Sequence, residues 1–314
     1  MKVFLTGTTG FIGSHVARRL IADGCEVYAL VHPSSNTWRV NDIVDSLNVV
    51  SCDLFSTEEL NKSLEQIRPD ICIHLAWYAE PGKYLNSLEN LRFMSASMQL
   101  ATRLANLGCK RFVGAGTCFE YDTDLGYLSE TSPTSPRSLY AASKLGLYLV
   151  LEQLSKMMGL GVAWLRFFYL YGPYEDERRL VPSVICSLLR NQEAKVTKGE
   201  QIRDFLHVED VAAAIWTVAQ SNLLGPVNIG SGKPVAVRDV ATKIGEILNR
   251  LGLIKFGALP YSTSEPMFVC ANNSRLVGNT TWVPRYDLEE GLRLTVDWWQ
   301  AHIRSFRPRA KGGC

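Results

Sequence analysis

A glycine-rich turn between an apolar run and a helical pattern constrains this chain more than any other feature. The turn covers residues 6–13, reads TGTTGFIG and directly follows the strand-like run 2–5. Glycines let a backbone turn tightly and approach a pyrophosphate, whose charge meets unpaired N–H groups at the start of the following helix. The position of the turn therefore predicts a dinucleotide site. The residues expected to contact the dinucleotide here are Gly7, Thr9, Gly10, Phe11, Ile12 and Gly13.

Apolar runs of strand length alternate with helical patterns through the first half of the chain. Short runs that are buried on both faces, with helices between them, are typical of a parallel sheet. We therefore expect an α/β fold, a Rossmann-type doubly wound parallel sheet, with residues 1–173 as the dinucleotide-binding domain. The strand-like runs are 2–5, 26–31, 48–52, 71–74, 111–114 and 161–168, and the helical patterns cover about 11–23, 57–67, 84–107 and 138–158, the last closed by Gly159.

Beyond Gly172-Pro173 the strict alternation is lost. Helical patterns continue near 180–190, 208–221, 237–251 and 288–302. Ligands bind at the carboxyl edge of such a sheet and need a cover, so we expect residues 174–306 to form mainly a smaller, mixed α/β substrate-binding lobe. Whether residues 206–232 return to the first domain is left open. The basic, glycine-bearing tail 307–314 is expected to be frayed.

Composition excludes several classes of protein. Hydrophobic residues make up 46% and charged residues 20% of the 314 residues, which allows a sizeable core and excludes a disordered or fibrous chain. A formal charge of +2 favours neither nucleic acid nor an anionic membrane as a partner. The eight cysteines form no C-x-x-C or Cys/His cluster, which indicates reduced thiols and no metal site. With no secretory signal and no apolar stretch long enough for a bilayer, we expect a soluble cytoplasmic protein.

The end of the second strand indicates which dinucleotide is bound. The ten residues there read LVHPSSNTWR and contain no Asp or Glu that could accept hydrogen bonds from the ribose 2′-hydroxyl of NAD. A 2′-phosphate would instead meet His32, the hydroxyls of Ser34 and Ser35, and Arg39, which favours NADP over NAD. A solvated loop that contacts nothing is the alternative. After the third strand, Asp53 could lie against the adenine amino group or simply cap a helix.

A tyrosine and a lysine lie four residues apart at the start of the predicted helix 138–158. This spacing places Tyr140 and Lys144 on the same helix face. A free tyrosine, with a pKa of about 10, is a poor acid–base catalyst at neutral pH, and lowering that pKa by about three units needs roughly 4 kcal/mol of differential stabilisation. A neighbouring ammonium favours the phenolate. Alone, this pair is typical of an ordinary helix surface, but beside a dinucleotide turn it predicts an acid–base site.

A series of motifs spans nearly the whole chain in a fixed order, and through them the chain resembles the extended short-chain dehydrogenases/reductases of the sugar-nucleotide epimerase/dehydratase type. The motifs are TGxxGxxG at 6–13, His74-Leu75-Ala76, the segment Thr117–Tyr121, Tyr140-x-x-x-Lys144, Arg166-Phe167-Phe168, Tyr171-Gly172-Pro173, Arg203-Asp204-Phe205, His207-Val208-x-Asp210 and Asn228-Ile229-Gly230.

This resemblance implies roles for individual residues. Tyr140 would be the catalytic acid or base, and Lys144 would hold the nicotinamide ribose and tune Tyr140. Thr117 would hydrogen-bond the reacting oxygen, although a strand-end hydroxyl can also satisfy its own backbone. Arg203 would pair with the substrate diphosphate. Further cofactor contacts are expected at Leu54, Leu75, Ala76 and Phe167, and further substrate contacts at Tyr78, Tyr169 and Val181.

Three departures from the family pattern are present, and the first of them narrows the reaction. In the family's 4,6-dehydratases an Asp-Glu pair follows the threonine and eliminates water, whereas this chain has Cys118-Phe119. Glu120 comes one place later and should point to the opposite side if strand alternation continues. Dehydration is therefore disfavoured. Tyr169 replaces the family's usual Asn, and the usual Arg-Pro-Gly-Asp is absent from 262–266.

The distal half favours one reaction among those that remain. Residues 199–205, 256–258 and 267–273 resemble the CDP-abequose synthase group of 4-ketoreductases. A cofactor that is consumed each turnover also suits reduction. We therefore expect NADPH-dependent reduction of the 4-keto group of a nucleoside-diphosphate 4-keto-6-deoxyhexose. An epimerase that retains NAD is the alternative, and a non-catalytic NADP-binding sensor or scaffold is a third reading. The family also implies a homodimer through the helices near 84–107 and 138–158.

Overall fold

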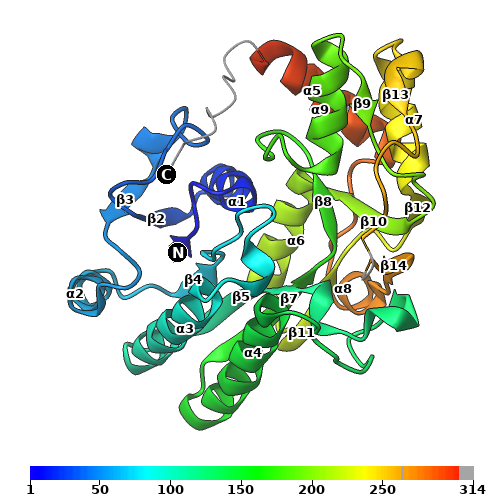
Figure 1. The fold of residues 1–314 in the computed structure, drawn as a ribbon. Coiled ribbons are helices and arrows are strands. Elements are labelled where there is room, and N and C mark those ends of the chain that lie inside the picture. Colours follow the sequence, from blue (N-terminus) through cyan, green and yellow to red (C-terminus); the bar gives the residue numbers. More distant parts are fainter. Residues whose placement is uncertain (263–264, 304–314) are drawn as a thin grey trace.

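A seven-stranded parallel sheet organises the larger part of the molecule (Figure 1). The structure is a computed structural model and describes residues 1–262 and 265–303. The strand order is β11-β7-β5-β4-β1-β2-β3, so the chain winds outward in both directions from β1, which confirms the predicted doubly wound fold. The strands are β1 (Lys2–Thr6), β2 (Glu26–Val31), β3 (Asn48–Ser51), β4 (Ile71–His74), β5 (Arg111–Thr117), β7 (Gly161–Phe167) and β11 (Gly225–Ile229).

Helices cover both faces of this sheet. One face carries α1 (Phe11–Ala22) and α6 (Val208–Gln220), and the other carries α2 (Thr57–Ile67), α3 (Glu89–Asn106) and α4 (Leu139–Met158). Helix α4 begins where the Ser138 hydroxyl accepts the Ala141 N–H and ends at Gly159, which has a left-handed backbone. The predicted helix over 84–107 is shorter, because Ser87 is extended and separates the 3₁₀ turn η2 (Tyr84–Asn86) from α3.

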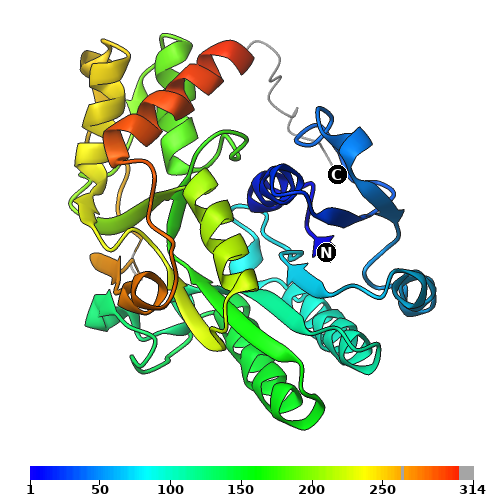
Figure 2. The ribbon, with the colours of Figure 1, turned by 180° about the vertical axis from the view of Figure 1, so that it is seen from behind.

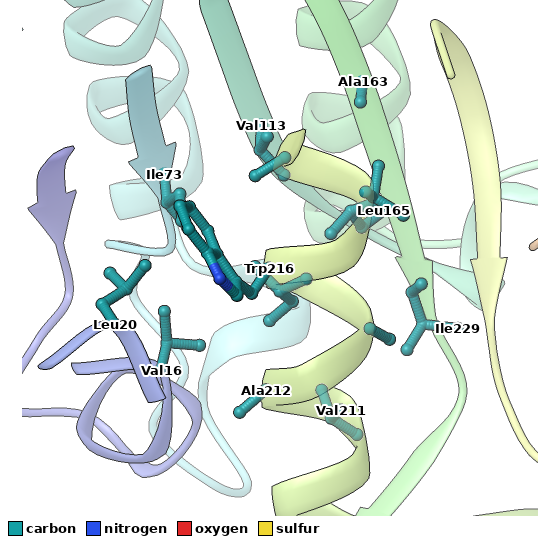
Figure 3. Close-up of a cluster of buried hydrophobic side chains, with 14 of the residues drawn as sticks. Val16, Leu20, Ile73, Val113, Ala163, Leu165, Val211, Ala212, Trp216 and Ile229 are labelled. Carbon is teal, nitrogen blue, oxygen red and sulfur yellow. The ribbon is translucent and has the colours of Figure 1, made fainter. Parts of the chain in front are cut away.

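The core between the sheet and its first helix layer fixes α1 in place. Trp216 of α6 is buried between the two layers, with Val16 and Leu20 of α1 beside it and Ile73 and Val113 on the sheet (Figure 3). Burying side chains of this size contributes about 1.5–3 kcal/mol each to the stability of the fold. The glycine turn that leads into α1 is thereby held against the ends of the strands.

The second lobe is built around β10 (Ile202–His207), as the predicted mixed α/β lobe requires (Figure 2). Strand β10 pairs antiparallel with β12 (Pro234–Ala236) and parallel with β14 (Phe268–Ala271) and β8 (Tyr169–Tyr171). The remaining elements are β6 (Tyr127–Leu128), β9 (Ala194–Lys195), β13 (Ile254–Lys255), α5 (Leu180–Leu189), α7 (Val237–Ile247), α8 (Ser274–Asn279), α9 (Leu288–His302), and the 3₁₀ turns η1 (Val44–Ser46), η3 (Cys118–Glu120), η4 (Thr123–Leu125) and η5 (Leu251–Leu253).

The segment over 206–232 lies in the layers of the first sheet. Helix α6 packs against α1, and β11 pairs in parallel with β7 at the edge of that sheet. The tail 307–314 lies outside the described residues. In the part of the chain that the structure describes, the seven cysteines are unpaired, no group of His, Cys, Asp and Glu could hold a metal ion, and no helix is long and apolar enough to span a membrane.

Candidate active site

One cavity of about 1010 Å³ lies at the carboxyl ends of the sheet strands and extends under the second lobe. A cavity of this size is at the upper end of the range for ligand pockets. Among the predicted site residues, Ser34 and Tyr78 do not contribute to its wall. The predicted residues that do are Gly7, Thr9, Gly10, Phe11, Ile12, Gly13, His32, Arg39, Asp53, Leu54, Leu75, Ala76, Thr117, Tyr140, Lys144, Phe167, Tyr169, Val181 and Arg203.

The glycine turn forms the first end of the cavity. Gly7 has a φ of +75°, and a Cβ there would lie 2.8 Å from the backbone nitrogen of Ala76. A Cβ on Gly13 would lie 2.0 Å from the carbonyl oxygen of Gly7. Gly10 is the N-cap of α1, no side chain caps that helix, and its first turn has no acidic residue. Its free N–H groups and positive end fit a pyrophosphate, so these residues can hold a dinucleotide.

The loop after β2 places His32 beside the carboxylate of Asp53. The Nε2 of His32 lies 3.6 Å from Oδ2 of Asp53, and its Nδ1 lies 2.9 Å from the hydroxyl of Ser34. Ser34, whose hydroxyl contacts His32, does not line the cavity. Asp53 accepts the N–H of Phe55 and is not the cap of α2, whose N-cap residue is Ser56.

Arg39 is held beside the glycine turn. Its Nε donates to the backbone oxygen of Tyr174 at 2.8 Å, and its Nη1 donates to that of Thr9 at 3.4 Å. The Tyr174 ring lies 5.5 Å from that of Trp38 and 4.8 Å from that of Trp298 in α9. The loop after β2 is thus attached through aromatic contacts to the last described helix.

The three predicted catalytic residues come together in the middle of the cavity. Thr117 ends β5, while Tyr140 and Lys144 lie in the first two turns of α4. The Thr117 hydroxyl lies near the Tyr140 phenol, where it acts to lower the pKa of that group, and it accepts the N–H of Phe119. The ring of Tyr84 meets that of Tyr140 edge-on at 4.9 Å. The phenol is therefore held at the cavity wall with a hydroxyl beside it.

Lys144 is engaged by groups other than the tyrosine. Its Nζ donates to the carbonyl oxygen of Ala115 at 2.8 Å and lies 3.6 Å from the centre of a Trp77 ring. The distance from Nζ to the centre of the Tyr140 ring is 6.0 Å. Burial lowers the pKa of Lys144 to about 7, and the charge of Glu120 opposes this shift. Trp77, and not Tyr78, lines the cavity, with its indole N–H bound to Asn90.

The acidity of Tyr140 differs from the prediction. Burial raises the pKa of Tyr140 above its usual value, Tyr84 and Glu120 act in the same direction, and the contact with Thr117 opposes them. The amine of Lys144, which was predicted to acidify Tyr140, is directed to Ala115 and Trp77. Tyr140 is therefore a neutral phenol at neutral pH, suited to giving a proton rather than taking one.

Glu120 is directed away from the cavity, as expected, but not through strand alternation. It lies in η3 and is fully buried, where its carboxylate accepts Arg166 Nε at 2.7 Å, the indole of Trp164 and the backbone N–H of Thr117. In its place Cys118 and Phe119 line the cavity. Burial raises the pKa of the Cys118 thiol to about 12, so this thiol does not replace a catalytic carboxyl at neutral pH.

The far end of the cavity contains an arginine that is already paired. Arg203 is 3% exposed, and its Nη2 lies 2.8 Å from Oε1 of Glu265. The amide of Gln201 donates to the same oxygen at 3.3 Å, and the guanidinium lies over the Tyr169 ring. The sequence analysis did not find Glu265, because no motif connects it with Arg203.

A charged segment between β8 and α5 was also missed. Arg178 pairs with Asp176 at 2.7 Å and with Glu80, from the loop after β4, at 3.4 Å. Arg178, Arg179, Glu175 and Asp176 all line the cavity. The signal that could have revealed them is the run EDERR at 175–179, which begins two residues after the Tyr-Gly-Pro motif.

Comparison with known proteins agrees with this fold. The model of the NAD dependent epimerase/dehydratase family matches residues 3–230, which include the glycine turn, the Tyr140 and Lys144 pair and all strands of the large sheet. The chain belongs to this family of nicotinamide-dependent enzymes.

Three relatives represent the range of the comparisons. A trifunctional UDP-glucose 4,6-dehydratase/UDP-4-keto-6-deoxy-D-glucose 3,5-epimerase/UDP-4-keto-L-rhamnose-reductase of Arabidopsis thaliana is 29% identical over 95% of this chain, which spans 47% of that protein's length. The CDP-abequose synthase of Salmonella muenchen is 23% identical, with 93% of this chain and 96% of the relative covered. The UDP-glucose 4-epimerase of Thermus thermophilus in complex with NAD has a TM-score of 0.83 at 25% identity, with 96% and 99% covered.

Proposed function

We propose that this protein reduces the 4-keto group of a nucleoside-diphosphate 4-keto-6-deoxyhexose. The observation that carries the proposal is the wall around Tyr140, where Thr117 and Lys144 are present and Cys118 and Phe119 stand where a dehydratase needs acids. A bound nicotinamide would supply the hydride. Tyr140 would donate a proton to the developing alkoxide, and the Thr117 hydroxyl would hydrogen-bond the same oxygen. Lys144 would hold the nicotinamide ribose.

The protonation of Tyr140 supports reduction over epimerisation. An epimerase must first remove a proton from a sugar hydroxyl, for which it needs a phenolate, whereas a reductase begins by giving a proton. Burial raises the pKa of Tyr140 and so keeps the phenol protonated. The likeness to CDP-abequose synthase points in the same direction.

We further propose NADP as the cofactor. The positive charge of Arg39 lies beside the glycine turn, and residues 30–39 at the end of β2 contain no carboxylate that would bind the ribose hydroxyls of NAD. Replacement of Arg39 by Met should weaken NADPH binding about tenfold or more and leave NADH binding nearly unchanged. Equal losses for the two cofactors would contradict the role of Arg39.

The test of the reaction measures oxidation of NADPH and of NADH with CDP-, dTDP- and GDP-linked 4-keto-6-deoxyhexoses. At least one substrate should consume NADPH stoichiometrically. Tyr140→Phe should lower turnover by roughly 100-fold or more, since it removes the proton donor, while NADPH affinity is retained. Tyr127→Phe is the matched control, because Tyr127 is exposed and outside the cavity. Unchanged turnover in Tyr140→Phe would refute the mechanism.

The second candidate function is a sugar-nucleotide epimerase. The similarity to the NAD complex of a UDP-glucose 4-epimerase favours it. A carboxylate is also present beside the loop after β2, because Asp53 lies next to His32 in the cavity wall. Tightly bound NAD that copurifies with the protein, together with no net consumption of NADPH by any 4-keto sugar, would favour the epimerase.

We also propose that the two parts of the chain bind different ligands and that the protein forms a homodimer. Residues 1–173 would bind the cofactor together with α6 and β11, and the rest of 174–306 would bind the sugar nucleotide.

Apolar side chains at the start of α3 and along α4 are exposed, with Leu88 at 73% and Met157 at 82%. These neighbouring helices would pack against a second copy. A monomer in sedimentation at micromolar concentration would contradict the dimer.

A further inference from the structure

The carboxyl group of Glu175 belongs to the cavity wall and has no role in the reaction proposed above. The residue is 7% exposed and lines the cavity. Its Oε2 is buried and has no hydrogen-bond partner in the described part of the chain. Buried polar atoms are nearly always hydrogen-bonded, because an unsatisfied one has lost its water without compensation. A carboxyl group with an unpaired oxygen in a cavity wall therefore indicates a hydrogen-bond partner on a ligand.

Glu175 lies in the segment between β8 and α5, whose neighbouring residues contact both parts of the molecule. The preceding residue, Tyr174, accepts a hydrogen bond from Arg39 at its backbone oxygen, and its ring packs on that of His15 in α1 at 5.6 Å. On the other side, Arg179 is the N-cap residue of α5 and lines the same cavity. The segment that carries this carboxyl group thus contacts the loop after β2 and α1 through Tyr174, and leads into α5 at Arg179.

The charge state of Glu175 decides what it can bind. Burial raises the pKa of Glu175 well above its ordinary value; the nearby Arg179 opposes this shift, and Asp176 adds to it. The other charged groups around this junction are Arg39 from the loop after β2 and Arg178 from its own segment. A protonated carboxyl is a hydrogen-bond donor, and phosphate oxygens are strong acceptors. A bound phosphate would also favour the protonated form, because two like charges repel.

We propose that Glu175 is a phosphate-binding residue that donates a hydrogen bond from its protonated carboxyl to a nucleotide diphosphate in the cavity. The identity of this ligand rests on the proposed function, since both the dinucleotide and a sugar nucleotide carry a diphosphate. The residue acts here as a neutral donor beside arginines. Acidic side chains normally repel phosphates, and only the burial of this one makes it compatible with the ligand.

The test is calorimetric binding of NADPH and, separately, of UDP and CDP to three variants. Glu175→Gln keeps a neutral donor of the same shape and should stay within about threefold of the unaltered protein. Glu175→Ala removes the donor and should weaken one ligand about tenfold or more. The ligand that is weakened identifies the diphosphate. The matched control is Glu177→Ala, because Glu177 pairs with Arg190 and lies outside the cavity wall.

Proton exchange gives a second, independent readout. Binding should take up protons at pH values where Glu175 begins to ionise in the free protein, which calorimetry in two buffers of different ionisation enthalpy measures. Glu175→Gln should abolish this uptake. Lys144 also titrates near neutrality, so Lys144→Met should retain the uptake.

Two results would overturn the proposal. Equal weakening by Glu175→Gln and Glu175→Ala would show that the group acts as a carboxylate acceptor, for example toward ribose hydroxyls. Unchanged affinity for every ligand in Glu175→Ala would show that it binds none of them. Both measurements are of binding alone, so failure to turn over any 4-keto sugar would reject the proposed function and leave this inference standing.

Discussion

The two ends of the cavity are built in different ways. At the first end the backbone makes the site, through the glycine turn and the free N–H groups of α1, and a Cβ on Gly7 or Gly13 would collide with backbone atoms. At the other end side chains make the site, and Arg203 is already paired with Glu265. A backbone site is ready before its ligand arrives. A side-chain site must exchange one partner for another, so its affinity depends on the competing carboxylate.

The largest effect is expected from adding a single methyl group to the glycine turn. Gly13→Ala places a Cβ 2.0 Å from the carbonyl oxygen of Gly7, and neither backbone segment can give way without moving α1. We expect a loss of roughly 3 kcal/mol or more in the free energy of unfolding, together with loss of dinucleotide binding. Denaturant melts and cofactor fluorescence measure both. Gly278→Ala is the control, because nothing lies within 4 Å of the added atom.

At the other end of the cavity, removing the positive charge and removing the negative charge should change UDP affinity in opposite directions. Arg203→Met should weaken UDP binding by about 10- to 100-fold, because it removes a charged hydrogen-bond donor. Glu265→Gln should strengthen the same binding severalfold, because it removes the anion that now holds Arg203. Titration calorimetry measures both, with NADPH affinity as the internal control. A weaker affinity in Glu265→Gln would mean that Glu265 positions the arginine and does not compete for it.

A buried histidine near the glycine turn should also lower the free energy of unfolding in acid. His74, at the end of β4, is fully buried between Thr6 and Ser97, and burial lowers its pKa to about 3. Below pH about 6.5 the unfolded chain binds a proton that the folded protein cannot accept, so stability falls by about 1.4 kcal/mol per pH unit for this residue.

Between pH 6.5 and 5 the expected loss from His74 alone is therefore about 2 kcal/mol. His15 and His207, whose pKa values burial lowers to about 4, add to it over the same window. Melts at a series of pH values should show a shallower slope in His74→Gln. An unchanged slope in that variant would contradict the assignment.

The smallest expected effect lies in the middle of the cavity, where the two ends meet. The ring of Trp77 lies against the amine of Lys144, and such a contact favours the charged form by about 1 kcal/mol. Trp77→Leu should therefore lower the pKa of Lys144 and move the alkaline limb of the kcat profile to lower pH. Phe93→Leu is the control, since Phe93 packs on Trp77 on the side of α3. A uniform loss of kcat without a shift would indicate a structural role only.

Local signals in the sequence were sufficient for most of the fold and for the first end of the site. Helix α2 and strand β4 have the predicted bounds, because caps, turns and apolar periodicity are local properties. The glycine turn and the spacing of Tyr140 and Lys144 are local as well. Their roles toward ligands stay predictions, while their common position in one cavity is observed.

Properties that depend on the tertiary structure could not be derived in this way. The pairing of Arg203 with Glu265 joins positions 62 residues apart. Whether Trp77 or Tyr78 faces the cavity depends on the path of the loop after β4. The acidity of Tyr140 depends on which group the Lys144 amine contacts, and spacing along a helix does not determine that contact.

The aromatic contacts between Tyr174 and Trp298 have a consequence for biosynthesis. The loop that would read the adenosine half of the cofactor is encoded near the start of the chain, yet its support comes from α9, which leaves the ribosome last among the described helices. A nascent chain can complete the large sheet before this support exists. The packing of the loop after β2 is therefore completed only after α9 has been synthesised.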